Sequence, residues 1–67
     1  MVTQPMWVEV RRVQGRIIAE MWKELLEAEG VPTRLLSENL EEGELSTYRV
    51  LVPHFREHVY EEILRKI

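Results

Sequence analysis

Apolar residues recur every three or four positions between Gly15 and Pro32, and this spacing predicts an amphipathic helix. Six large side chains define its apolar side, namely Ile17, Ile18, Met21, Trp22, Leu25 and Leu26. With Ala19 and Ala28 they cover an arc of roughly 180 to 200°, which is wider than the stripe of about 100° that one surface requires. We therefore expect this whole arc to be buried by two neighbouring elements.

The end of this helix carries the clearest local signal in the chain. Gly30 can adopt the left-handed conformation that follows a last helical residue, and Val31 can then pack back on Leu26. Pro32 cannot continue a helix because its ring fixes the backbone and it has no N–H. Gly15 is a weaker start, since it lacks the side-chain oxygen of a good N-cap. The sequence thus indicates a helix that depends on packing.

The segment 7–13 has the alternating pattern of a half-buried strand. Val8 and Val10 are expected on the core face, because residues two apart point to the same side of a strand. The other face would carry the remaining side chains, Trp7, Glu9, Arg11 and Val13. For Trp7 the sequence leaves two interpretations open, a partly covered aromatic and an anchor for a partner protein.

Two more strands are expected at 33–37 and 48–52, joined by an acidic hairpin loop at 37–46 that is either mobile or functional. Alternation places Leu35 and Leu36 on opposite faces. In the last strand it places three residues on the core face, Tyr48, Val50 and Val52. Arg49 and Leu51 would then lie on the face away from the core.

A second amphipathic helix is predicted from His54 to Ile67. Its apolar stripe consists of Phe55, Val59, Ile63 and Ile67, widened by Tyr60 and Leu64. His54 and His58 are spaced i, i+4 and could bind one metal ion on a helix, with Glu61 as a third ligand. Both histidines fall on a convex polar face without a converging fourth ligand, so we expect no metal site and no cofactor.

The predicted order is strand, helix, strand, strand, helix. A right-handed crossover makes the first two strands parallel, and the third strand can then pair between them. This arrangement is a ferredoxin-like α+β fold, βαββα, with a three-stranded antiparallel sheet ordered 1-3-2 and two helices on one face. We expect one domain at 7–67 after a flexible lead-in at 1–6. The first strand would keep an unpaired edge, and one sheet face would have no helix over it.

Composition narrows the function classes. The chain has 67 residues and no cysteine. Its net charge of -3 argues against a nucleic-acid-binding domain, because such domains usually carry a positive face. Arg11, Arg12 and Arg16 form a local basic cluster, but no aromatic platform is interleaved with it. No apolar run approaches the length of a membrane span, and residues 1–5 show no signal-peptide pattern. We therefore expect a soluble, cytoplasmic protein.

No set of catalytic residues can be assembled from the sequence. Cysteine and aspartate are absent, and no glycine-rich phosphate loop follows a strand. Three glutamates in the acidic loop, Glu41, Glu42 and Glu44, resemble a solvated face more than an acid and base pair. The sequence therefore predicts a protein that is not an enzyme.

Three segments carry a family resemblance: Ala19-Glu20, the run from Leu25 to Pro32, and Val50-Leu51-Val52-Pro53. Over residues 7–67 the chain resembles a small bacterial family of domains of unknown function, described as candidate signal-transducing proteins of prokaryotes. The resemblance implies a ferredoxin-like fold, distantly similar to PII-type nitrogen regulators, and a regulatory or binding role. The family supplies no catalytic residues to transfer.

The predicted function is a small interaction or regulatory module. It would form a homodimer or bind a protein partner through the edge of the first strand and the uncovered sheet face. The expected contact residues are Trp7, Val8, Val10, Val13 and Leu51. The alternative is a regulatory domain that senses a small ligand at a boundary between subunits.

Overall fold

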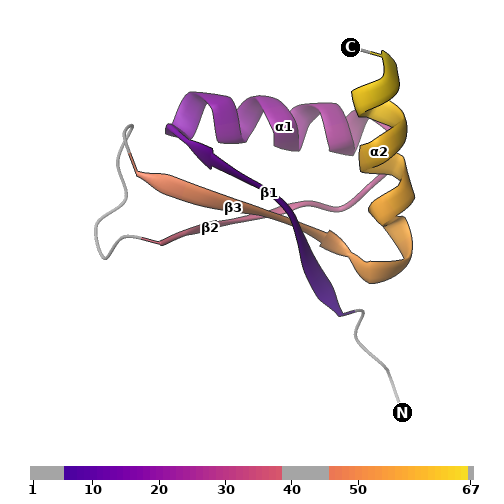
Figure 1. The fold of residues 1–67 in the computed structure, drawn as a ribbon, viewed down its shortest axis with the longest axis horizontal. Coiled ribbons are helices and arrows are strands. Elements are labelled where there is room, and N and C mark those ends of the chain that lie inside the picture. Colours follow the sequence, from indigo (N-terminus) through magenta and orange to yellow (C-terminus); the bar gives the residue numbers. More distant parts are fainter. Residues whose placement is uncertain (1–5, 39–45, 67) are drawn as a thin grey trace.

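The computed structural model describes residues 6–38 and 46–66 (Figure 1). Its elements follow in the order β1 (Trp7–Gln14), α1 (Arg16–Ala28), β2 (Arg34–Ser37), β3 (Thr47–Pro53), a 3₁₀ turn η1 (His54–Arg56) and α2 (Glu57–Lys66). The predictions for the lead-in at 1–5, for positions 39–45 of the acidic loop and for Ile67 lie outside the described residues.

The three strands form one antiparallel sheet in the order β1-β3-β2. Val8 aligns with Val52 across the first pair, and Leu35 aligns with Val50 across the second. Both helices contribute to the same core against this sheet, and α2 crosses near the C-terminal end of α1 (Figure 1). The predicted ferredoxin-like α+β topology is confirmed.

The C-terminus of α1 has the predicted geometry. Gly30 adopts a φ of 81°, its N–H donates to the Glu27 carbonyl at 2.9 Å, and the Val31 N–H donates to the Leu26 carbonyl at 3.0 Å. This pair of bonds is a Schellman motif, and Val31 and Leu26 are both fully buried. The motif turns the chain at the end of α1 and sends it into β2.

The predicted burial of α1 is only partly correct. Ala19, Trp22 and Leu26 are buried in the core, and α1 contacts both the sheet and α2. Four residues expected in the core are exposed, and we call them the α1 stripe: Ile17, Ile18, Met21 and Leu25. They face away because the short helix α2 crosses α1 instead of running along it (Figure 1).

A β-bulge in β1 corrects the predicted faces of this strand. Glu9 aligns with Leu51 and Arg11 with Val50, so Val10 is an extra residue without a partner on β3. Residues after the bulge are therefore shifted to the opposite face from the one that simple alternation predicts. Val13, expected on the face without helices, is buried in the core.

The second helix also differs from its prediction. Residues 54–56 form a 3₁₀ turn, and the α-helix begins only at Glu57. A 3₁₀ turn has about 3.0 residues per turn instead of 3.6, so it places Phe55 outside the apolar stripe. Phe55 is exposed, and the Arg56 guanidinium lies 5.6 Å from the centre of its ring. Of the other predicted residues, Tyr60 and Ile63 are buried and Val59 packs against the core, as expected, whereas Leu64 is exposed.

Candidate interaction surface

The outer edge of β1 is the longest row of backbone groups that faces away from the sheet. Two hydrogen bonds bracket its pairing with β3: the Gly15 N–H donates to the Ser46 carbonyl at 2.9 Å, and the His54 N–H donates to the Met6 carbonyl at 2.7 Å. Backbone groups of successive residues alternate between the two sides of an antiparallel strand. Counting from both ends, Val8, Arg11 and Val13 direct their backbone groups toward β3.

Four residues of β1 consequently direct their N–H and C=O groups away from β3, and we call them the outward row: Trp7, Glu9, Arg12 and Gln14. β1 is terminal in the sheet order, so no strand within residues 6–38 and 46–66 lies on that side of it. An edge strand of this kind is a ready template for pairing with another strand. The predicted unpaired edge is therefore present over the full eight residues of β1.

The sheet face without helices carries ion pairs, together with one exposed leucine, Leu36, which aligns with Arg49. The Glu9 carboxylate accepts a hydrogen bond from the Arg49 Nε at 2.7 Å, and Arg12 Nε lies 3.1 Å from the same carboxylate. Arg12 also contacts the Glu38 carboxylate, with its Nη1 at 3.0 Å. These pairs connect β1 with β3 and with Glu38, the residue after β2, and we call this side of the sheet the ionic face.

Two of the apolar residues predicted on this face, Trp7 and Leu51, do lie there and are largely covered. Leu51 is buried in the middle of the sheet, aligned with Glu9 on one side and Arg34 on the other. The Arg34 guanidinium lies 4.5 Å from the centre of the Trp7 ring, and Trp7 is half-buried. Trp7 is thus a partly covered aromatic, in agreement with the first of its two interpretations.

The other predicted contact residues lie on the helix side of β1. Val8 and Val10 are half-buried and pack against the core, whereas Val13 belongs to the core itself. Val13 and Leu51 therefore offer no exposed apolar surface. Half-buried side chains remain accessible at Trp7, Val8 and Val10, all in the first half of β1.

A cluster of side chains joins β1 to both helices, and no pattern in the sequence indicates it directly. The bulge turns Arg11 toward the helices, where its Nη1 donates to the Tyr60 hydroxyl at 3.0 Å. The Arg11 guanidinium also lies 5.0 Å from the centre of a Trp22 ring, and the rings of Trp22 and Tyr60 are 5.4 Å apart. Only the position of the bulge could have revealed this contact.

Beside this cluster, a hollow of about 290 Å³ lies between β1 and α2. Three carboxylate residues and three largely apolar ones line it: Glu9, Glu57, Glu61, Val10, Tyr60 and Leu64. It adjoins the free edge of β1 on the helix side of the sheet. Its carboxylates favour a positively charged side chain from any strand that pairs with β1.

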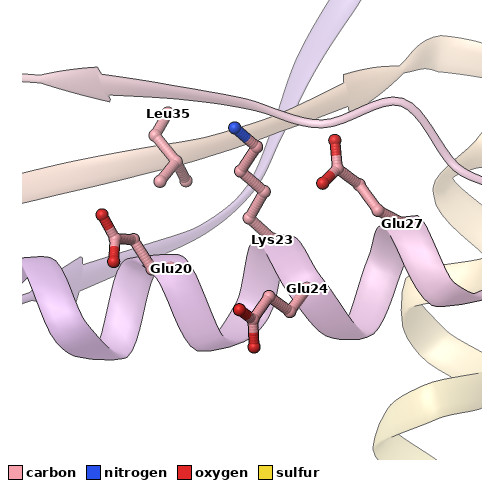
Figure 2. A pocket seen from close by; sticks show the side chains of 5 residues that line it. All are labelled: Glu20, Lys23, Glu24, Glu27 and Leu35. Atoms are coloured by element: carbon pink, nitrogen blue, oxygen red, sulfur yellow. The ribbon is translucent and has the colours of Figure 1, made fainter.

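A second hollow, of about 260 Å³, lies between the polar side of α1 and β2. Figure 2 shows the Lys23 ammonium group pointing toward β2 between Glu20 and Glu27, whereas Glu24 points away from the strand. Leu35 is the apolar residue in its lining. The Glu20 carboxylate is itself bound by Arg16 Nε at 3.2 Å. Four of the five residues that line this hollow are charged side chains of α1.

His54 and His58 do not share one regular helix, because His54 lies in η1 and His58 in α2. The Nδ1 atom of His54 is 3.5 Å from a carboxylate oxygen of Glu57. No group of three histidine or glutamate side chains suited to a metal ion occurs among the described residues. In the same part of the chain, no helix is long and apolar enough to cross a membrane.

Glu9 is the titratable residue that the ionic face perturbs most clearly. The hydrogen bond from Arg49 lowers the pKa of the Glu9 carboxyl below its ordinary value of 4.5, and the guanidinium of Arg12 adds to this effect. Because the folded state depresses this pKa, the ionised carboxylate stabilises the fold. That contribution is present above the ordinary pKa and is lost as the pH falls through the lower, folded value.

We expect an NMR titration of the side-chain carboxyl to show Glu9 losing its charge at a lower pH than an ordinary glutamate. Arg49→Gln should move this midpoint back toward the ordinary value, because it removes the largest cause of the shift. Glu24→Gln is a matched control on the polar side of α1, away from Glu9, and should leave the Glu9 midpoint unchanged. A Glu9 midpoint that is ordinary in the unmodified chain would contradict the ion pairs of the ionic face.

Comparison of the chain with protein-family models finds no match, and comparisons with curated proteins and with solved structures find none either. The resemblance to the family of candidate signal-transducing domains therefore stays a prediction.

Proposed function

We propose that this chain is a small protein-interaction module that binds an extended strand of a protein along the outer edge of β1. The observation that carries the proposal is the outward row, whose backbone donors and acceptors face away from β3. Strand addition of this kind obtains its affinity from main-chain hydrogen bonds and its specificity from alternate side chains. The eight residues of β1 are enough for several such bonds.

The two sides of β1 define the chemistry of the expected partner strand. On the helix side, half-buried Val8 and Val10 offer apolar contacts, and the hollow with Glu57 and Glu61 lies next to Val10. A partner residue on that side is therefore expected to be apolar or basic. On the other side, Glu9 and Arg12 favour charged or polar partners of either sign. The partner should be an extended segment with apolar and basic residues.

A small-ligand sensor is supported less well. Ligand pockets are mostly apolar with a few polar groups, and they enclose most of the ligand surface. The two hollows beside the helices are lined mainly by carboxylates, three in each. This chemistry favours a basic side chain over an apolar small molecule. The regulatory role implied by the family resemblance would then act through protein contact.

A random peptide library displayed on phage tests the proposal, with the chain immobilised at low density. Arg12→Pro removes the positive charge of Arg12 and one outward N–H. Arg12→Ala removes the same positive charge but keeps the N–H. We expect selected peptides to bind the unmodified chain and Arg12→Ala but to lose binding to Arg12→Pro. Bound peptide should also slow amide hydrogen exchange at Glu9 and Arg12.

The control for the peptide experiment is Glu24→Ala on the polar side of α1, which should leave peptide binding unchanged. Equal binding of the selected peptides to Arg12→Pro and to the unmodified chain would overturn the proposal. A selection that yields no binding peptide from the library would also contradict it.

A further inference from the structure

We infer that the strand which fits the edge of β1 is β1 of a second copy of this chain, paired antiparallel about a two-fold axis between Val10 and Arg11. The two three-stranded sheets would then form one continuous sheet of six strands. This inference rests on the proposed function, because it names the partner of the same edge. The spacing of the outward row and the charges of its residues support this pairing.

The bulge selects one register for this pairing. Residues that face each other across a new antiparallel ladder must both direct their backbone groups outward. The outward row is Trp7 and Glu9 before the bulge, and Arg12 and Gln14 after it. One register alone pairs all four of these residues with outward residues of the second copy. It places Trp7 opposite Gln14 and Glu9 opposite Arg12, each pair occurring twice.

The charges match in that register. Opposite charges directly across a strand pair stabilise it, whereas like charges destabilise it. Glu9 of one copy would lie between Arg49 of the same copy and Arg12 of the second copy. Arg12 of the second copy would lie between this Glu9 and Glu38 of the second copy. Signs therefore alternate across the joined ionic faces. Registers centred on Glu9 or on Arg12 would instead place two like charges together.

The helix side of the joined sheet matches as well. The same register places half-buried Val8 of one copy opposite Val13 of the other; Val13 is buried in its own core, so Val8 supplies the apolar surface at this position. It also places Arg11 of the second copy opposite Val10, which lines the acidic hollow with Glu57 and Glu61. Each Arg11 guanidinium is held by Tyr60 and Trp22 of its own copy, and Tyr60 lines that copy's hollow. The helix side therefore adds the contact of Val8 to this register, while the charges of the ionic face select it.

Sedimentation velocity over a range of concentrations, with paired charge reversals, tests this register. Glu9→Lys alone places two positive charges together in each pair, and Arg12→Glu alone places two negative charges together. We expect each variant to dimerise at least roughly tenfold more weakly than the unmodified chain. In a mixture of the two variants, Lys at position 9 faces Glu at position 12, and Arg12 faces Glu9, so a dimer of one copy of each should form.

Circular dichroism should show that both variants keep the fold, because these side chains lie on the surface. Glu27→Lys and Lys23→Glu reverse charges on α1 and serve as matched controls, which should leave dimerisation unchanged. A dimer that is insensitive to both reversals at positions 9 and 12 would overturn the inference. So would a mixture that stays monomeric, or a dimer that is lost on Met21→Glu in the α1 stripe.

The two proposals fail in different ways. The chain could be monomeric at high concentration and still bind library peptides at the edge of β1, with binding lost in Arg12→Pro. That result would overturn the self-pairing and would support the proposed interaction module. A dimer that is unaffected by Arg12→Pro, with no peptide bound at β1, contradicts both proposals.

Discussion

Leu26→Ala is expected to lower the free energy of unfolding by about 3 kcal/mol, which is most of the stability of so small a domain. Leu26 is fully buried at the centre of the core, with Val31 folded over it by the Schellman motif. Truncation removes its apolar contacts and leaves a cavity between α1 and β3. Urea unfolding followed by circular dichroism measures the loss.

Leu25→Ala is the matched control, since it makes the same chemical change at the neighbouring position of the same helix. Leu25 is 37% exposed and lies in the α1 stripe. We expect it to cost less than about 1 kcal/mol, because much of the side chain is already in water. The comparison uses a concentration at which the chain is monomeric. Equal losses for the two variants would show that the burial of α1 differs from the one described.

Val13→Pro is expected to prevent folding or to lower the free energy of unfolding by about 3 kcal/mol. The Val13 N–H points toward β3, where its residue aligns with Tyr48, and the side chain is buried in the core. Proline removes that donor and leaves a buried acceptor on β3 without its partner. Thermal unfolding followed by circular dichroism measures the effect.

Arg12→Pro makes the same change one residue earlier and should be far milder. The Arg12 N–H belongs to the outward row, and edge strands tolerate proline where the N–H faces away from the sheet. The remaining loss comes from the exposed ion pairs with Glu9 and Glu38, and it should be small because solvent screens such pairs. Arg12→Ala reports that part separately. A loss for Arg12→Pro as large as that for Val13→Pro would contradict the assigned direction of the outward row.

The ionic face changes where a partner is expected to bind. A sheet face without helices is often a site of apolar contact, which is why Trp7 and Leu51 were natural candidates. Here Arg34 covers the Trp7 ring and Leu51 is buried, while the carboxylates of Glu9 and Glu38 neutralise Arg12 and Arg49. Among the described residues, the α1 stripe on the helix side of the sheet groups four exposed apolar side chains, whereas the ionic face exposes the single large apolar residue Leu36. The edge of β1 therefore carries the proposal more directly than the ionic face does.

The sequence by itself determined the features that depend on neighbouring residues. The end of α1 at Gly30 follows from the conformational freedom of glycine and the missing N–H of Pro32, and neither needs a tertiary partner. The strands and the sheet order follow from alternation and from the handedness of a crossover, which are also local or nearly universal rules. Tyr48, Val50 and Val52 accordingly lie on the core face, as predicted.

The tertiary structure decided the features that depend on the β-bulge in β1 or on the direction in which α2 crosses α1. The bulge at Val10 exists only relative to β3, yet it determines the face of every later residue of β1, including Arg11 and Val13. The exposure of the α1 stripe depends on the direction in which α2 crosses, which periodicity within α1 cannot encode. The candidate edge was thus visible in the sequence, but its outward row and charge pattern were set by the pairing of β1 with β3.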